Sequence, residues 1–312
     1  MRLLFHSTLD DPTDWLPHLL AHAPDLQIPD LRIEVWPDVS DPAAIDVALV
    51  WTPPEGGLQQ FPNLRAILSL GAGVNQLDLA SLPDVPLARL IDPGLTESMV
   101  GYAMIGVGWF GRDMHHFAAD QRAGRWNYRV ARAPRDVSVG VMGLGELGGA
   151  IARKLVHEGY TVHGWATSRR GVAGVTVHAG QDEFEQFLAS SQIVVNGLPL
   201  TPATRNILDA RAFAAMPPGA CLINEGRGGH VVEEDLLAAL DSGRLAGAML
   251  DVFQAEPPAA HSPLWSHAKV IMTPHIAGAI RPGTAAAGIV ENCRRAMAGE
   301  RLVNQVDRDR GY

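Results

Sequence analysis

The chain has 312 residues, of which 47% are hydrophobic and 19% are charged, so it can bury a sizeable core and is not disordered by composition. This length favours two domains over one. The 34 acidic residues outnumber the 25 basic residues and give a formal net charge of −9, which argues against general binding to nucleic acid or to anionic membranes. We therefore expect a globular protein that captures any anionic ligand at a local site.

The start of the chain and its cysteines indicate where the protein resides. The apolar stretch before Asp10 is too short for a signal peptide, and no apolar run is long enough to cross a bilayer. Cys221 and Cys293 cannot form a disulfide framework, and neither has the spacing of a metal-binding cysteine motif. We expect a soluble cytoplasmic protein with two buried structural thiols.

Apolar runs of strand length alternate with helical stretches along almost the whole chain, which is typical of parallel sheets with crossover helices. A first series of predicted strands covers residues 2–7, 31–36, 47–52 and 66–71. A second series covers residues 138–143, 161–166, 193–199, 221–226, 247–252 and 269–274. Nearly continuous apolar character indicates sheets that are covered on both faces. The sequence therefore predicts two doubly wound α/β domains.

Residues 96–124, between the two series, form a predicted helix with little polar face. Such a helix must be buried, against the other domain or against a second subunit. Each of its glycines (Gly101, Gly106, Gly108 and Gly111) weakens a helix by up to about 1 kcal/mol relative to alanine, and we interpret them as points of close helix contact. We prefer a homodimer interface through residues 97–124 over an interdomain helix. A further helix is predicted at residues 282–299.

A glycine-rich motif follows the predicted strand at residues 138–143. It reads Gly143, Leu144, Gly145, Glu146, Leu147 and Gly148. Its first glycine permits a tight turn, the second lets a pyrophosphate approach the backbone, and the third allows close packing of helix on strand. The helix and strand that follow complete a βαβ unit of the expected length, so we predict a dinucleotide-binding loop.

The end of the next strand indicates which dinucleotide binds. An NAD-binding protein normally has an acidic residue there to bind the ribose hydroxyls, but this chain has Ala166 and Thr167. Ser168, Arg169 and Arg170 follow and supply a hydroxyl and two cations where a 2′-phosphate would lie. We therefore expect NADPH in preference to NADH.

Three residues suited to ketone chemistry stand just beyond later strands: Arg227, Glu256 and His275. Their positions would bring them together outside the carboxyl edge of the sheet, where ligands bind in open α/β folds. Together with the glycine loop, these segments resemble the D-isomer-specific 2-hydroxyacid dehydrogenase family over nearly the whole chain. The spacings of 29 and 19 residues within the trio agree with that family's pattern.

The glyoxylate/hydroxypyruvate reductase A branch of that family is the most similar. The shared stretches are ALVWTPP, SLGAGVNQLD, GHVVEEDLLAALDSG, AGAMLDVF, SPLW and the terminal VDRDRGY. One departure is Gly226, where the family more often has alanine, and the added backbone freedom could loosen Arg227. The resemblance implies a flavodoxin-like substrate domain (residues 1–97 plus 285–312) and a Rossmann NAD(P)-binding domain (residues 98–284), with the active site in the cleft between them.

The resemblance also implies a role for each catalytic residue. Arg227 would bind the substrate carboxylate and carbonyl oxygen and stabilise the negative charge that develops there. Protonated His275 would be the general acid, and Glu256 would orient its imidazole and favour the protonated form. The implied reaction is the reduction of small 2-keto acids, glyoxylate to glycolate and hydroxypyruvate to D-glycerate, with NADPH.

Further contacts are implied on the same basis. Asp251 resembles the residue that binds the nicotinamide carboxamide, and the loop along the cofactor is represented by Leu198, Pro199 and Thr204. For the substrate, backbone N–H groups of Ala72 and Gly73 would meet the carboxylate. Trp51 would wall the pocket and Arg281 would add positive charge, although packing or a surface position explains either residue equally well.

We expect no metal site. His18 and His22 have a metal-compatible spacing but no third ligand nearby, and the neighbouring His115 and His116 should diverge on a helix. Hydride transfer to a ketone needs no metal when arginine and histidine supply the electrostatics.

Two alternatives stay open. The pocket could admit bulkier 2-keto acids such as phenylpyruvate, because sequence does not reveal its size. A protein of this fold can also act as a dinucleotide-sensing binding protein, although the chain has no long basic, proline-rich or acidic tail for partner recruitment.

Overall fold

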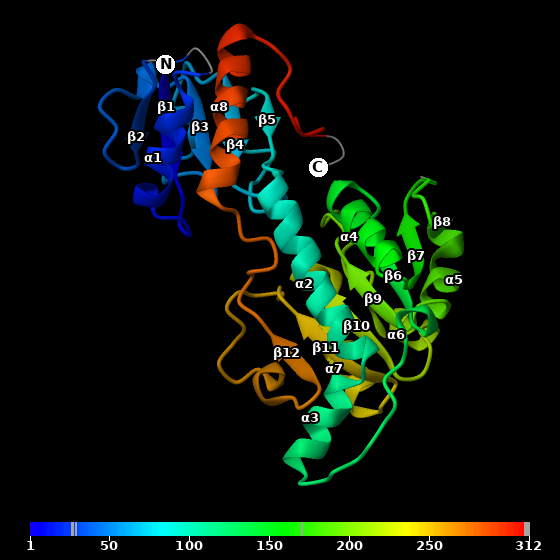
Figure 1. Cartoon of the computed structure of the whole chain (residues 1–312). Helices are drawn as coiled ribbons and strands as arrows, with labels where there is room; N and C mark the ends of the chain where they lie inside the picture. The colour runs from blue at the N-terminus through cyan, green and yellow to red at the C-terminus, as the bar shows by residue number, and fades with distance from the viewer. Residues whose placement is uncertain (26–27, 29, 170, 309–312) are drawn as a thin grey trace. The chain divides into compact units, whose positions relative to one another are not determined.

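A computed structural model describes residues 1–25, 28, 30–169 and 171–308. The chain divides into two compact units, Met1–Leu95 with Ile280–Tyr312 and Thr96–Ala279. Each unit contains one wholly parallel sheet, so the predicted pair of parallel α/β domains is confirmed (Figure 1). Among the described residues, no helix is both long and apolar enough to span a membrane.

The first unit is built on a five-stranded sheet with strand order β2-β1-β3-β4-β5. Its strands are β1 (Arg2–His6), β2 (Arg32–Val35), β3 (Val47–Val50), β4 (Ala66–Ser69) and β5 (Leu87–Ala88). Its helices are α1 (Pro12–His22), α8 (Pro282–Ala298) and the short 3-10 turns Pro42–Ala44 and Leu58–Gln60.

Alternation along the strands divides the core of this unit between the two faces of the sheet. Leu3 and Phe5 of β1 pack in one cluster with Trp15 of α1 and Ile289 of α8. Leu4 packs on the other face, in a cluster that contains Phe61 and Val74. Both faces are therefore covered, as the continuous apolar strands indicate.

The second unit is built on a seven-stranded sheet with strand order β12-β11-β10-β9-β6-β7-β8. Its strands are β6 (Ser138–Met142), β7 (Thr161–Ala166), β8 (Val175–Ala179), β9 (Ile193–Asn196), β10 (Ala220–Asn224), β11 (Leu245–Leu250) and β12 (Val270–Met272). Its helices are α2 (Pro93–Gly111, of which residues 96–111 belong to this unit), α3 (Met114–Arg122), α4 (Glu146–His157), α5 (Phe184–Ala189), α6 (Ala210–Ala215) and α7 (Glu233–Asp241). Short 3-10 turns cover Pro134–Asp136, Gln181–Glu183, Gly228–His230 and Pro263–Ser266.

This strand order places a switch point between β6 and β9, because the chain continues from β6 to β7 on one side and returns to β9 on the other. Ligands of open α/β sheets bind outside the carboxyl ends of the strands at such a point. The segments that begin at Gly143 and Gly197 meet there, since each directly or closely follows one of these two strands.

The sequence-based strand assignment missed two strands. β5 has only 2 residues and β8 carries polar residues at alternate positions, so neither has the continuous apolar run that marks the other strands. Both lie at a sheet edge, where one side of the strand is unpaired.

The prediction of one helix over residues 96–124 was wrong, because the structure has two helices separated by Asp113 in the left-handed conformation (φ 57°). Only one of its glycines makes a close contact. A Cβ on Gly106 would lie 2.6 Å from Ile223, whereas Gly101 and Gly108 face open space and Gly111 has ordinary packing distances.

The expectation that His115 and His116 diverge was also wrong. Their rings lie 4.1 Å apart, centre to centre. Both residues belong to the first turn of α3, and side-chain rotation there brings two neighbouring rings together despite the 100° step between their Cα–Cβ bonds. The predicted burial of both cysteines is confirmed, since Cys221 and Cys293 are free thiols in the core.

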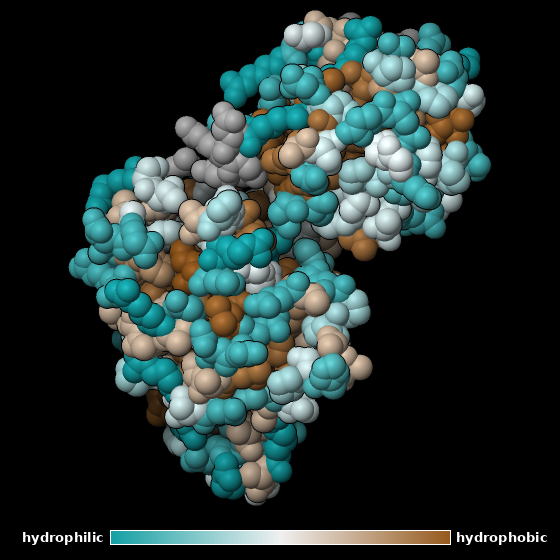
Figure 2. Space-filling view, turned by 180° about the vertical axis from the view of Figure 1, so that it is seen from behind, coloured by the Kyte–Doolittle hydropathy of each residue, from teal (hydrophilic) through white to brown (hydrophobic). Residues whose placement is uncertain are grey.

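Viewed from behind, most of the visible surface is hydrophilic, with apolar residues scattered among polar ones (Figure 2). Scattered apolar residues are ordinary on a protein surface, whereas contiguous apolar patches indicate binding sites. The large apolar side chains with the greatest exposure, Trp126, Tyr128 and Val130, are close together in the sequence.

Candidate active site

The glycine loop leaves the backbone at the start of α4 open to a ligand. Gly143 has φ 90°, a conformation that favours glycine, and turns the chain out of β6. Gly145 precedes α4 without a side-chain cap, and, its chain neighbours apart, no atom of the described residues lies within 4 Å of where its Cβ would be. The N–H groups of the first turn and the positive end of the helix can therefore receive a phosphate group.

Gly148 serves packing instead. A Cβ at this position would lie 1.8 Å from the carbonyl oxygen of Gly143, which is backbone and cannot move aside cheaply. The three glycines thus have the separate functions that the sequence motif predicted: a turn, an open approach and a close contact.

The loop after β9 forms one side of this region. Leu198 is buried, and its side chain lies 3.2 Å from the position of a Cβ on Gly143. Thr204 donates a hydrogen bond of 2.7 Å to the carbonyl of Pro199, which closes the loop on itself. The structure therefore places Leu198 against the glycine loop, while Thr204 stabilises the segment that carries Leu198 and Pro199.

β7 ends at Ala166, so no acidic side chain stands at the end of this strand. Ser168 is exposed beyond it. Arg169 is 61% exposed and donates to the carbonyl of Val177 and to the carboxylate of Glu183, so its guanidinium is anchored at the edge of the sheet with part of its donor set facing solvent. Arg170 lies outside the described residues.

Arg227 follows β10, and hydrogen bonds fix both its backbone and its guanidinium group. The side chain of Asn224 donates to the Arg227 carbonyl (3.2 Å), and the guanidinium of Arg227 donates to the Gly226 carbonyl (2.7 Å). Burial lowers the pKa of Arg227, and the nearby Glu256 opposes that effect. Since the ordinary pKa of arginine is above 12, the group stays a cation.

The glycine before this arginine has a structural reason. A Cβ on Gly226 would lie 3.2 Å from both the side-chain nitrogen of Asn196 and the carbonyl oxygen of Leu198. An alanine would fit only if one of these neighbours moved by a few tenths of an ångström. Glycine fits at this position without such a movement.

His275 and Glu256 form the central pair of the site. Nδ1 of His275 lies 2.7 Å from a carboxylate oxygen of Glu256, whose other oxygen accepts a hydrogen bond from the backbone N–H of Phe253 (3.0 Å). Burial raises the pKa of Glu256, but the hydrogen bonds from His275 and Phe253 and the charges of His275 and Arg227 outweigh burial and lower it. Glu256 is therefore a carboxylate that accepts the Nδ1 proton.

This arrangement leaves Nε2 of His275 for a ligand. Within the described part of the chain, Nε2 has no hydrogen-bond partner, and the side chain is 32% exposed. A histidine fixed at Nδ1 by a carboxylate and open at Nε2 can exchange a proton with a substrate oxygen.

Asp251 holds the turn that presents His275. Its carboxylate accepts hydrogen bonds from the Thr273 hydroxyl (2.6 Å) and from the backbone N–H groups of Ile276 and Ala277 (2.8 Å each). Its carbonyl accepts from the N–H of His275, whose φ is 56°. Asp251 therefore stabilises a left-handed residue that is not glycine, and a contact with the carboxamide stays a prediction.

The sequence reasoning missed a buried polar network behind Arg227. Asn196 donates to the side chain of Asn224 (2.8 Å) and contacts Nδ1 of His230 (2.9 Å). The N–H of Arg227 also points to this Nδ1, so Nε2 carries the ring proton and donates to the Pro199 carbonyl (3.2 Å). Burial lowers the pKa of His230 to about 4, which keeps the ring neutral. The available signal was an asparagine at the end of two neighbouring apolar strands, Asn196 in β9 and Asn224 in β10.

Glu225 is a second feature that the sequence did not indicate. It lies directly after β10, is 3% exposed, and neither carboxyl oxygen has a hydrogen-bond partner among the described residues. Burial and the charge of Asp251 raise its pKa well above the ordinary value, so the group is a neutral acid in the folded protein.

The predicted substrate contacts other than Arg227 lie in the first unit. Trp51 packs over Gly71, where a Cβ would lie 2.7 Å from the indole ring. The backbone N–H groups of Ala72 and Gly73 have no acceptor in the described part of the chain, which leaves two adjacent donors for an anion. Arg281 is exposed and precedes α8. Contacts of these residues with a substrate stay predictions.

Known proteins share this fold and these segments. Residues 109–277 match the family model described as the NAD binding domain of D-isomer specific 2-hydroxyacid dehydrogenase. A D-isomer specific 2-hydroxyacid dehydrogenase from Xanthobacter autotrophicus, solved with NADPH and MES, is 43% identical, with a TM-score of 0.94 over 100% of this chain and 99% of that chain.

Two further solved structures are similar over the same extent. An NADPH-dependent glyoxylate/hydroxypyruvate reductase from Sinorhizobium meliloti, solved with NADP and sulfate, is 32% identical, with a TM-score of 0.91 over 100% of this chain and 99% of that chain. A probable 2-hydroxyacid dehydrogenase from Rhizobium etli, in complex with NADP, HEPES and L(+)-tartaric acid, is 32% identical, with a TM-score of 0.88 and the same coverage.

The glycine loop gives a matched pair of variants. Gly148→Ala should lower the free energy of unfolding by roughly 3 kcal/mol, because its Cβ meets backbone. Gly145→Ala should leave that free energy within about 0.5 kcal/mol, since the position faces open space, but should weaken NADPH binding at least several-fold. Urea unfolding and fluorescence titration measure the two quantities. Equal stability of both variants would contradict the assigned packing function.

Glu225→Gln tests the buried neutral acid. Above the ordinary pKa of 4.5 the unfolded chain releases this proton while the folded chain keeps it, so the folded state loses stability as pH rises toward the elevated pKa. The variant should therefore become more stable than the wild type with rising pH, by up to about 1.4 kcal/mol per unit. Urea unfolding between pH 4 and pH 8 measures this, and Glu55→Gln is an exposed control. A constant difference across that range would disprove the assignment.

Proposed function

Because the chain belongs to the D-isomer-specific 2-hydroxyacid dehydrogenase family, we propose that it reduces small 2-keto acids with NADPH, converting glyoxylate to glycolate and hydroxypyruvate to D-glycerate. The observation that carries this proposal is the Glu256–His275 pair, with Nε2 of His275 open and Arg227 close enough to act on the same carboxylate. The relative from Sinorhizobium meliloti, whose name states this activity, supports the choice of substrates.

The cofactor assignment depends on the loop and on the end of β7. The uncapped start of α4 and the open space at Gly145 fit a diphosphate. The absence of a carboxylate after Ala166 and the cations that follow favour a 2′-phosphate over free ribose hydroxyls. Three similar structures contain NADPH or NADP, which supports the same conclusion. When bound, the cofactor supplies the hydride.

The protein side chains perform the remaining work. Arg227 binds the substrate carboxylate and draws electron density toward the carbonyl oxygen, so that developing negative charge faces a fixed cation. Nε2 of protonated His275 delivers a proton to that oxygen. Glu256 accepts the Nδ1 hydrogen bond and keeps the ring in one orientation. Asp251 acts through the turn that carries His275.

Initial rates of NADPH and NADH consumption test the proposal directly. Glyoxylate and hydroxypyruvate should be reduced fastest, and NADPH should be preferred, with Arg169→Ala reducing that preference because the cation at the end of β7 is lost. Faster reduction of phenylpyruvate would assign bulkier 2-keto acids instead. No turnover with any of these acids, from a folded protein that binds NADPH, would overturn the enzymatic function and favour a dinucleotide-sensing protein.

The catalytic pair predicts two different losses. His275→Ala should lower kcat by roughly 100- to 10,000-fold, the usual size of a general-acid contribution, with NADPH affinity unchanged. Glu256→Gln should lower kcat by about 10-fold, because the charge-assisted hydrogen bond that orients the imidazole is lost. Steady-state kinetics across pH measures both. Activity of His275→Ala within a few-fold of wild type would exclude it as the acid.

We also propose a homodimer, on the basis of the segment that follows α3. Arg125, Asn127 and Arg129 all donate to the carboxylate of Asp120. The residues that alternate with them, Trp126, Tyr128 and Val130, are 100%, 84% and 78% exposed. Ile105 of α2 is also exposed, between the open positions Gly101 and Gly108. A second copy would bury this apolar surface.

Sedimentation velocity tests the homodimer. The wild type should sediment as a dimer, and Trp126→Ser combined with Tyr128→Ser should shift it toward the monomer, because the two largest exposed rings are removed. Trp265→Ser, at a position that is 55% exposed elsewhere on the second unit, is the matched control and should remain dimeric. A monomeric wild type, or a double variant that stays fully dimeric, would contradict the proposal.

A further inference from the structure

A polar cavity of about 330 Å³ lies at the opposite edge of the seven-stranded sheet from the catalytic residues. Its walls include Ile193, the first residue of β9, and Ala220 and Cys221, which begin β10. Arg227 follows the other end of β10. Since the strands are parallel, this cavity is at the amino edge and is separate from the candidate active site.

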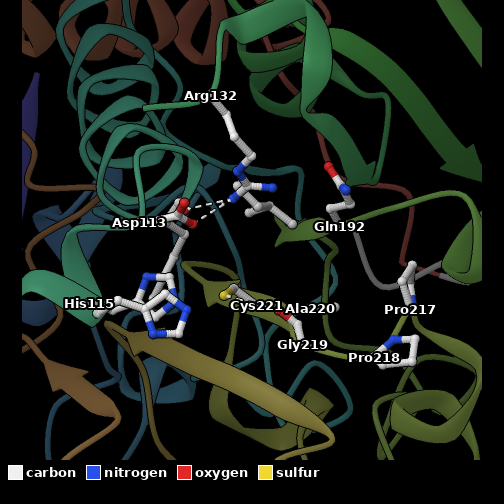
Figure 3. Close-up of a pocket in the computed structure, with 12 residues that line it drawn as sticks. Asp113, His115, Arg132, Gln192, Pro217, Pro218, Gly219, Ala220 and Cys221 are labelled. Carbon is white, nitrogen blue, oxygen red and sulfur yellow. Dashed lines mark hydrogen bonds and ion pairs between the residues drawn. The ribbon is translucent and has the colours of Figure 1, made fainter. Parts of the chain in front are cut away.

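Three side chains that can bind a metal ion converge on this cavity (Figure 3). Asp113, His115 and His116 each offer one ligand atom, and these atoms all lie within 4.8 Å of one another. Asp113 has a left-handed backbone conformation directly before α3, and the two histidines follow in the first turn. A single short segment therefore presents all three donors to one point.

His115 is the strongest indication of a ligand. Both of its ring nitrogens are buried, and neither has a hydrogen-bond partner among the residues that the structure describes. A neutral imidazole carries its proton on one ring nitrogen and a free lone pair on the other. Buried polar atoms without partners are rare in proteins, and a metal ion would satisfy this lone pair.

The carboxylate is oriented by an arginine. Arg132 donates to one oxygen of Asp113 (3.0 Å) and to the carbonyl of Phe110 (3.2 Å), so it fixes Asp113 against the end of α2. The positive charge of Arg132 opposes the approach of a metal cation. Its hydrogen bond also holds the Asp113 carboxylate in one orientation, as outer-shell groups do for carboxylates that bind metals. Two imidazoles and one carboxylate suit Zn²⁺ and its neighbours better than Mg²⁺ or Ca²⁺, which prefer oxygen ligands.

We propose that Asp113, His115 and His116 form a binding site for a divalent transition-metal ion of the Zn²⁺ class. The site has three protein ligands, and water completes the coordination. Cys221 lines the same cavity but does not belong to the cluster of ligand atoms. Because the site is at the amino edge of the sheet, its function is structural: it fixes the junction between α2 and α3 beside β10.

A Zn²⁺ titration of the untagged, metal-free protein against a chromogenic chelator tests this site. The wild type should bind one tight equivalent per chain. His115→Ala and Asp113→Asn should each weaken that binding at least about 10-fold. Asparagine tolerates the left-handed conformation at position 113, so Asp113→Asn decides the result if His115→Ala does not fold.

The chain provides its own control in His18 and His22, whose spacing on α1 also suits a metal. Replacing both with alanine should leave the tight equivalent unchanged. Added Zn²⁺ should raise the midpoint of thermal unfolding of the wild type and of this control, but not of the two site variants. The proposal is overturned if the wild type binds no tight equivalent, if the site variants bind as tightly as the wild type, or if the control loses binding.

Discussion

The carboxylate of Asp251 is the constraint on which the catalytic half of the protein depends. It directly follows β11 and accepts three hydrogen bonds from the segment that follows β12. These bonds help to hold His275 in a left-handed conformation, which costs free energy for a residue with a Cβ. Two successive hydrogen bonds extend this support to α2. They link the Tyr102 hydroxyl to the Thr273 hydroxyl, and the Thr273 hydroxyl to the Asp251 carboxylate. The position of one imidazole therefore depends on two strands and a helix.

A second set of hydrogen bonds supports Arg227. The side chains that form it are neutral, whereas the first set is centred on the carboxylate of Asp251. Asn196, Asn224 and His230 satisfy one another in the core and tie the arginine backbone to the loop after β9. The carboxyl oxygens of Glu225, which lies between Asn224 and His230 in the sequence, have no hydrogen-bond partner among the described residues, and burial favours its protonated form. Placing a neutral acid there avoids a second buried negative charge beside Asp251, which keeps the anion of Asp251 available to the turn.

The sequence could predict which residues follow the ends of the strands and what the glycines of the loop do. Apolar runs indicated the buried strands, and the order of turns and helices located Gly143, Arg227, Glu256 and His275 at the carboxyl edge. Besides β5, the buried polar network behind Arg227 and the buried Glu225, three features escaped. β8 is an edge strand with polar alternation. The break at Asp113 depends on a left-handed residue that helix periodicity does not reveal. The convergence of His115 with His116 depends on rotamers, which follow from tertiary packing and not from spacing.

The first unit is assembled from both ends of the chain, and this affects the order in which the protein can fold during synthesis. Ala285, Ile289 and Cys293 of α8 complete the cluster around Leu3 and Phe5, so the face of the sheet that carries α1 stays only partly covered until α8 has been synthesised. The second unit is continuous in sequence and contains its own core. Domains generally fold as units during translation, so the nucleotide-binding sheet can form first, while the N-terminal strands wait with an apolar face exposed.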